Sequence, residues 1–164
     1  MSNMFCFQCQ QTAGNKCCVN TGVCGKQPET AKLQDELVYE LIQLAETAEK
    51  NGQHTKEADR LLMDGLFTTL TNVNFDNEAI KEFTGRVQKE KEKIGNDEIA
   101  VVSLWEGAND IVSLRSTLLF GLKGMAAYAH HAMNLGFENN AVTNWFYKGL
   151  CEINREHSVE EWIE

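Results

Sequence analysis

Five of the six cysteines of this chain are concentrated between positions 6 and 24. Cys6 and Cys9 are separated by two residues, a spacing with which a loop commonly wraps one corner of a metal site. Eight residues then precede Cys18, and five more precede Cys24. Thiolates are the soft ligands that zinc and iron–sulfur clusters prefer. The N-terminal segment is therefore predicted to bind a metal centre.

Spacing favours an iron–sulfur cluster over two other interpretations of these cysteines. Zinc usually takes two C-x2-C corners, whereas the second pair here is spread as C-x5-C. A disulfide-closed cap needs an oxidising compartment, and the first residues lack the basic and apolar regions of a secretion signal. Cys17 and Cys18 are adjacent, and neighbours on an extended chain point in opposite directions. Spacing alone therefore leaves open which of these two is the ligand.

The residues around the cysteines are suited to a compact anionic cluster. Three glycines between positions 14 and 25 permit the loop to curl. Lys16, Lys26 and the positive end of a helix starting at Pro28 would stabilise negative charge if they face the cluster. Phe5 and Phe7 flank two of the cysteines and could shield a cluster from water.

The remainder of the chain repeats apolar residues at helical spacing and must position this segment. We predict helices over 28–51, 55–72, 76–94, 108–135 and 139–154. The fourth has the longest apolar pattern and is predicted to be the central helix. Ser158 and Glu161 form a capping-box signature for one more short helix.

The predicted fold class is all-α, a bundle of about five helices with an irregular, cysteine-rich N-terminal cap that binds the cluster. We predict a single domain. Its cap covers residues 1–26, its helical bundle covers 27–157, and residues 158–164 are the start of a truncated helix.

Net charge and hydropathy limit the classes of partner that this chain is expected to bind. With 24 Asp and Glu against 15 Lys and Arg, the net charge is -9, which disfavours nucleic acid and anionic membranes. A basic redox partner or a neutral protein surface fits better. No run of about 18 apolar residues occurs, so no membrane span is predicted. Together with the missing secretion signal, this predicts a cytoplasmic protein.

Several stretches of the sequence resemble one family. Residues 4–13 (MFCFQCQQTA) and 22–34 (GVCGKQPETAKLQ) resemble the N-terminus of hybrid cluster proteins, also called prismane proteins or hydroxylamine reductases. Residues 110–115 (DIVSLR) and 121–130 (GLKGMAAYAH) resemble a later helix of the same N-terminal helical domain. These stretches occur in the family's order.

The resemblance implies a [4Fe-4S] cluster bound by Cys6, Cys9, Cys18 and Cys24, which makes Cys17 an extra thiol. The family reduces hydroxylamine or nitric oxide at a second, hybrid cluster, whose ligands come from two further domains. Residues 1–164 include no counterpart of those ligands. The implied role is therefore an electron-transfer domain, with catalysis by this chain alone doubtful.

The resemblance also implies the partners of such a domain, namely a redox protein that donates electrons or the remaining domains of a longer hybrid cluster protein. A second hypothesis, from a different class, is a structural or interaction domain whose cysteine cap is closed by zinc or by a redox-inert cluster. Outside the cap, His130, His131 and Cys151 are predicted to be structural rather than metal ligands.

Overall fold

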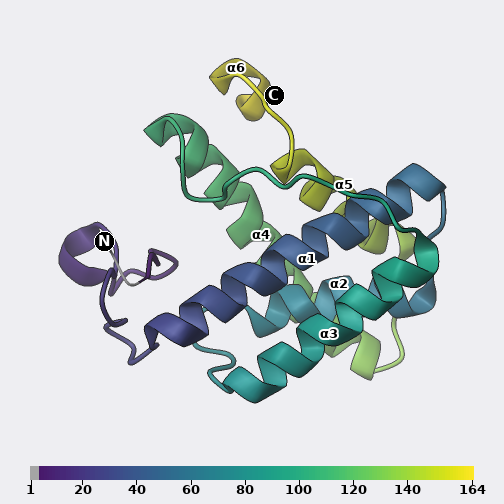
Figure 1. The fold of residues 1–164 in the computed structure, drawn as a ribbon, viewed down its shortest axis with the longest axis horizontal. Coiled ribbons are helices and arrows are strands. Elements are labelled where there is room, and N and C mark those ends of the chain that lie inside the picture. The colour runs from purple at the N-terminus through teal and green to yellow at the C-terminus, as the bar shows by residue number, and fades with distance from the viewer. Residues whose placement is uncertain (1–3) are drawn as a thin grey trace.

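The computed structural model of the protein describes residues 4–164, and these residues form helices joined by short connections. A 3-10 turn, η1 (Ala13–Asn15), precedes six α-helices (Figure 1). The α-helices are α1 (Pro28–Asn51), α2 (Lys56–Thr68), α3 (Asn77–Ile94), α4 (Asn109–Asn134), α5 (Asn140–Ile153) and α6 (Val159–Ile163). Between residues 4 and 164 there is no strand, so the all-α prediction is confirmed.

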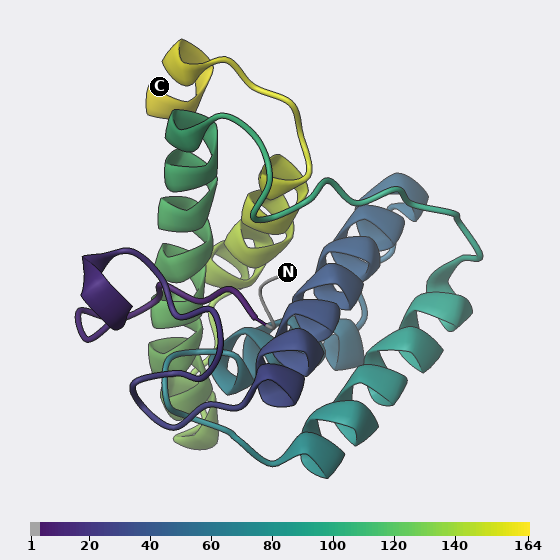
Figure 2. The same ribbon diagram turned by 60° about the vertical axis from the view of Figure 1, so that its left-hand side comes forward.

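The long helix α1 lies at the centre of the bundle. It contacts α2, α3 and α5 and contributes eleven buried residues. Figure 2 shows α3 on one side of α1 and α4 with α5 on the other. The main core consists of Leu, Ile, Val and Ala side chains from these helices, together with Phe146 and Tyr147 of α5.

The prediction that the fourth helix is central is wrong. Only Leu122 of its predicted apolar stripe is fully buried, and the other members are half-buried, namely Ile111, Leu114, Leu118, Met125, Ala129 and Met133. One of the three helices that α4 contacts is the five-residue α6, and only six residues of α4 are buried, against eleven of the shorter α1. On α5, the apolar spacing also predicts that Trp145 turns towards the core, but this side chain is 45% exposed.

Helix ends follow the local signals in the sequence. Pro28 occupies the first turn of α1, where its missing N–H needs no partner, and Gly52 ends the helix in the left-handed conformation. Asp76 caps α3 through its carboxylate, which accepts hydrogen bonds from two backbone N–H groups. The capping box of Ser158 and Glu161 is confirmed at the start of α6. The second helix ends at Thr68, four residues before the predicted end at 72.

The segment that joins α3 to α4, residues 95–108, runs back along the bundle as an irregular chain (Figure 1). Its backbone is anchored by the Leu104 N–H, which donates to the Tyr39 hydroxyl at 3.2 Å, and by the Val102 N–H, which donates to the Asn154 side chain at 2.9 Å. This course brings Trp105 beside the N-terminal residues.

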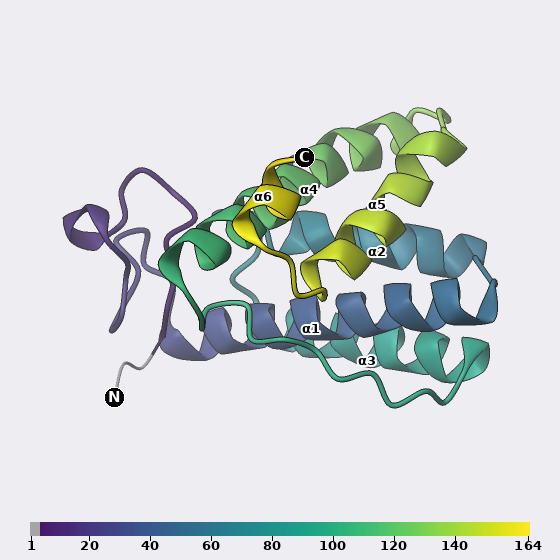
Figure 3. The ribbon, with the colours of Figure 1, turned by 90° about the horizontal axis from the view of Figure 1, so that it is seen from above.

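The described part of the cysteine-rich cap, residues 4–26, lies at the N-terminal end of α1, at one end of the bundle (Figure 3). It has a small apolar cluster of its own, formed by Met4, Cys6, Cys18 and Ala31 and separate from the main core. Among the described residues, no helix has both the length and the apolar character needed to cross a membrane.

Candidate metal centre

Cys6 and Cys18 are held opposite each other by their backbones. The Cys6 N–H donates to the Cys18 carbonyl at 3.1 Å, and the Cys18 N–H donates to the Cys6 carbonyl at 2.8 Å. Residues that exchange both hydrogen bonds in an antiparallel pair have side chains on the same face. The side chain of Cys17, the preceding residue, therefore belongs to the other face.

Cys9 and Cys24 lie in two tight turns of the cap. The Cys9 carbonyl accepts from the Thr12 N–H at 3.2 Å. Around Cys24, the Gly22 N–H donates to the Lys26 carbonyl at 2.8 Å, and the Gly25 N–H donates to the Gly22 carbonyl at 2.8 Å. A Cβ atom on Gly22 would lie 3.0 Å from the Cys24 sulfur, so a larger residue here would press on that thiol.

The four predicted ligands are brought into one cap but not into one closed set. Within residues 4–164, no group of three or more Cys, His, Asp or Glu side chains is arranged to hold a single metal ion. Cys6 and Cys18 form one pair, whereas Cys9 and Cys24 stand in separate turns. All six cysteines are free thiols. The donor set is nevertheless that of a thiolate-bound centre, and the loop has the turns that such a centre requires.

The surroundings of Cys18 stabilise its thiolate. Hydrogen bonds from the backbone N–H groups of Ala13 and Val23 lower the pKa of Cys18, with smaller contributions from the Thr12 hydroxyl and from the charge of Lys26, against the opposing effect of burial. The thiolate is the form of cysteine that binds metals. The polypeptide thus favours the ligand form at a position that is only 5% exposed.

Of the two lysines predicted to assist the site, one turns inward. Lys26 is buried, with its ammonium 2.6 Å from the Gln34 side-chain oxygen and 4.0 Å from the Cys6 sulfur. Lys16 is exposed. Positive charge therefore reaches the site from Lys26, which leads into the N-terminus of α1.

An aromatic cluster covers the inner side of the cap. The rings of Phe5 and Phe7 contact each other and Trp105, with centroid separations of 5.3 to 5.8 Å, and Phe7 also contacts Phe120 of α4. A small cavity of about 10 Å³ beneath them is lined by Cys6 among others. The sequence pointed to the two phenylalanines, but Trp105 and Phe120 lie about a hundred residues further along the chain and have no local signal.

Sequence reasoning also missed two charged groups near the cap, the half-buried Asp35, which lines this cavity, and the buried Lys123. Burial raises the pKa of Asp35 on α1 to about 6, and the nearby Lys123 and Lys26 oppose that shift. The Trp105 indole N–H approaches the carboxylate without completing a hydrogen bond. Burial lowers the pKa of Lys123 on α4 to about 8, against the opposing charge of Asp35. On their own helices, these residues look like ordinary surface charges.

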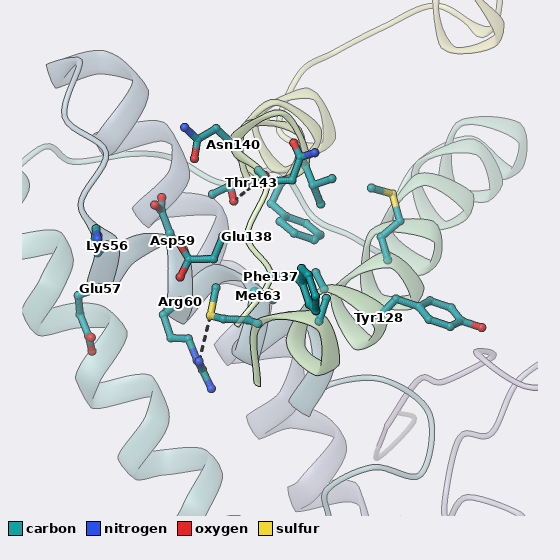
Figure 4. Close-up of a pocket in the computed structure, with 17 residues that line it drawn as sticks. Lys56, Glu57, Asp59, Arg60, Met63, Tyr128, Phe137, Glu138, Asn140 and Thr143 are labelled. Carbon is teal, nitrogen blue, oxygen red and sulfur yellow. Dashed lines mark hydrogen bonds between the residues drawn. The ribbon is translucent and has the colours of Figure 1, made fainter. Parts of the chain in front are cut away.

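A second hollow, larger than the cavity beside Cys6, lies away from the cysteines. It has a volume of about 820 Å³ and is lined by residues of α2, α4, α5 and the loop between α4 and α5, including Met63, Arg60 and Phe137 (Figure 4). Its lining includes no cysteine or histidine. Nothing in its chemistry connects it with the cap.

The remaining candidates from the sequence have structural surroundings. His130 Nδ1 lies 2.7 Å from Asp64 Oδ1 and its Nε2 lies 3.0 Å from the Asn134 amide, while His131 is exposed. Cys151 is 4% exposed, and burial raises the pKa of its thiol to about 12. That none of the three is a metal ligand stays a prediction.

Comparison with known proteins shows which sequences the chain is similar to. The sequence model of the Prismane/CO dehydrogenase family matches residues 4–163. The hydroxylamine reductase of Clostridium novyi (strain NT) is 37% identical over 193 residues, which cover 98% of this chain and 35% of that protein. The hydroxylamine reductase of Desulfovibrio desulfuricans (strain ATCC 27774 / DSM 6949 / MB) is 39% identical over 181 residues, which cover 93% of this chain and 33% of that protein. The chain thus spans about a third of the length of these relatives.

Proposed function

Because the chain belongs to the Prismane/CO dehydrogenase family, we propose that it is an electron-transfer domain that binds one [4Fe-4S] cluster through Cys6, Cys9, Cys18 and Cys24. The observation that carries the proposal is the backbone pairing of Cys6 with Cys18. It puts two of the four thiols on one face and excludes Cys17 from that face. The lowered pKa of the Cys18 thiol supports the same assignment.

Each part of the cap has a role in this proposal. When bound, a [4Fe-4S] cluster supplies reversible one-electron chemistry. The thiolates and backbone N–H groups hold it, and Lys26 offsets its negative charge. Phe5, Phe7 and Trp105 limit the access of water from the bundle side. The same cap therefore binds the redox group and controls its surroundings.

Hydroxylamine reduction is the activity named for the longer relatives. We propose that residues 1–164 supply electrons for such a reaction rather than carry it out. In that role the partner is a redox protein or the remaining part of a longer polypeptide. The proposed compartment is the cytoplasm, which agrees with six unpaired thiols. The division into a cap over 1–26, a bundle over 27–157 and a terminal helix start over 158–164 belongs to the same proposal.

Anaerobic purification with metal analysis tests the proposed function. We expect about four iron and four sulfide per chain, as a [4Fe-4S] cluster requires, and an EPR signal after reduction with dithionite. A zinc content near one per chain without iron would instead establish the zinc-closed structural domain. Hydroxylamine reduction with reduced methyl viologen should show no turnover above that of a free-cluster control.

A further inference from the structure

Lys123, on the inner side of α4, is a buried lysine with little compensation from the protein. It is 2% exposed, and its ammonium donates a hydrogen bond to the Thr69 carbonyl at 3.2 Å. Within the described residues it forms no ion pair with a carboxylate. A buried charge without a close partner is costly, so a nearby anion would stabilise the charged form of this lysine.

The groups that face Lys123 come from the cap and from α1. Phe120, one helical turn before Lys123 on α4, contacts Phe7 of the cap with ring centroids 5.5 Å apart. The titratable groups that act on Lys123 from this side are Asp35, Lys26 and Cys6. Those three residues also line the small cavity beneath Phe5 and Phe7. Two ammonium groups thus stand against one carboxylate, and the interior beside Cys6 carries an excess of positive charge. A site that holds four thiolates is anionic and would offset this excess.

We propose that Lys123 sets the reduction potential of the cap by stabilising its reduced form, with Asp35 acting in the opposite direction. The inference rests on the proposed function. One electron enters from a donor and later leaves to an acceptor, and no bond or proton changes place. The reduced site carries one more negative charge than the oxidised site. A positive charge held in a buried, low-dielectric position therefore favours reduction.

A purely structural role for Lys123 predicts something different. Its hydrogen bond to Thr69 ties α4 to the end of α2, so losing it would lower stability. That loss would leave the reduction potential of a folded, cluster-loaded protein unchanged. The potential is therefore the measurement that separates the two roles.

The test is a redox titration, monitored by EPR, of anaerobically purified Lys123→Met and Asp35→Asn proteins. For Lys123→Met we expect the ratio of reduced to oxidised cluster at a fixed solution potential to fall at least tenfold. For a one-electron couple, a tenfold fall corresponds to a midpoint potential that is 59 mV lower. For Asp35→Asn the ratio should rise. Lys123→Arg, which keeps the charge, should stay close to the wild type.

Lys148→Met is the matched control, because it removes the same charge from an exposed position on α5. Its midpoint should equal that of the wild type. Circular dichroism checks that Lys123→Met is folded. If it is not, Lys123→Gln replaces it, with a lower midpoint expected, and Asp35→Asn should still show a higher midpoint. Full iron and sulfide content with unmoved midpoints would overturn this inference alone. Wild-type protein without iron and sulfide would overturn the proposed function and this inference with it.

Discussion

Two adjacent cysteines, Cys17 and Cys18, have different surroundings although their chemistry is the same. The Cys18 side chain is buried against Met4 and Ala31, and its backbone is paired with Cys6. Cys17 is half-buried and lies outside that pair. The difference comes from the alternation of side chains along an extended segment.

Single substitutions should distinguish these two cysteines. Cys18→Ala should reduce the iron content of anaerobically purified protein to background, because each iron of a [4Fe-4S] cluster takes one protein thiolate. Cys17→Ala should retain wild-type iron and sulfide content. Metal analysis of the two purified proteins checks both outcomes. Equal loss in the two variants would contradict the assignment of Cys18 as the ligand.

The buried thiol of Cys151 should be chemically inert in the folded protein. With its pKa raised to about 12, on the order of one thiol in ten thousand is ionised at pH 8, and the thiolate is the reactive form. Iodoacetamide at pH 8 should therefore leave Cys151 unmodified in native protein and modify it in guanidinium chloride. Peptide mass spectrometry reads this out, with the half-buried Cys17 as the internal comparison. Labelling of Cys151 as fast as Cys17 would show that burial does not protect it.

At the scale of the elements, α4 and α5 approach each other closely at one glycine. Gly149 of α5 packs against Leu122 of α4, and a Cβ atom on Gly149 would lie 2.8 Å from two Leu122 carbons. Leu122 is itself 2% exposed and has little room to move. Small size at position 149 thus permits the helix contact.

Gly149→Ala should lower the free energy of unfolding by about 1 to 3 kcal/mol, because it overpacks this contact. Gly121→Ala on α4 is the matched control, since a Cβ there meets no atom within 4 Å. That control should gain up to about 1 kcal/mol from the better helix propensity of alanine. Urea titrations of both proteins measure the difference. A Gly149→Ala protein as stable as the control would mean that Leu122 adjusts without cost.

The molecule as a whole has two apolar clusters of unequal size. The main core is formed by side chains from all five helices α1 to α5. The cluster at the cap has only Met4, Cys6, Cys18 and Ala31. So small a cluster cannot by itself offset the conformational entropy of ordering the cap. Ligand binding by the cysteines would supply the missing stabilisation.

Removal of the metal centre should therefore loosen the cap and leave the bundle folded. After iron is removed by oxidation and chelation, the far-UV circular dichroism should keep nearly its full helical amplitude. Trypsin should then cleave after the exposed Lys16 faster than in the loaded protein. A large loss of helical signal on iron removal would show instead that the bundle depends on the cap.

Much of this architecture follows from local sequence signals. Pro28 marks a helix start because it has no N–H to satisfy, and Asp76 marks another because its carboxylate accepts from backbone N–H groups. Gly52 marks a helix end by its left-handed backbone. Helical periodicity gives the all-α class. The spacing of the cysteines, with the resemblance to a family, selects the four candidate ligands. These features are determined within a few residues of chain, so they can be read without the fold.

Tertiary structure decided which helix is central and what surrounds the cap. The apolar stripe of α4 does not reveal how much of that helix the bundle buries, and α1, with eleven buried residues against six on α4, proved to be the central helix. Asp35, Trp105 and Lys123 come together from segments far apart in sequence. Burial and the fields of neighbouring charges exist only after the chain has folded. The candidate cysteine ligands could therefore be predicted from the sequence, whereas the charged residues near them could be identified only from the tertiary structure.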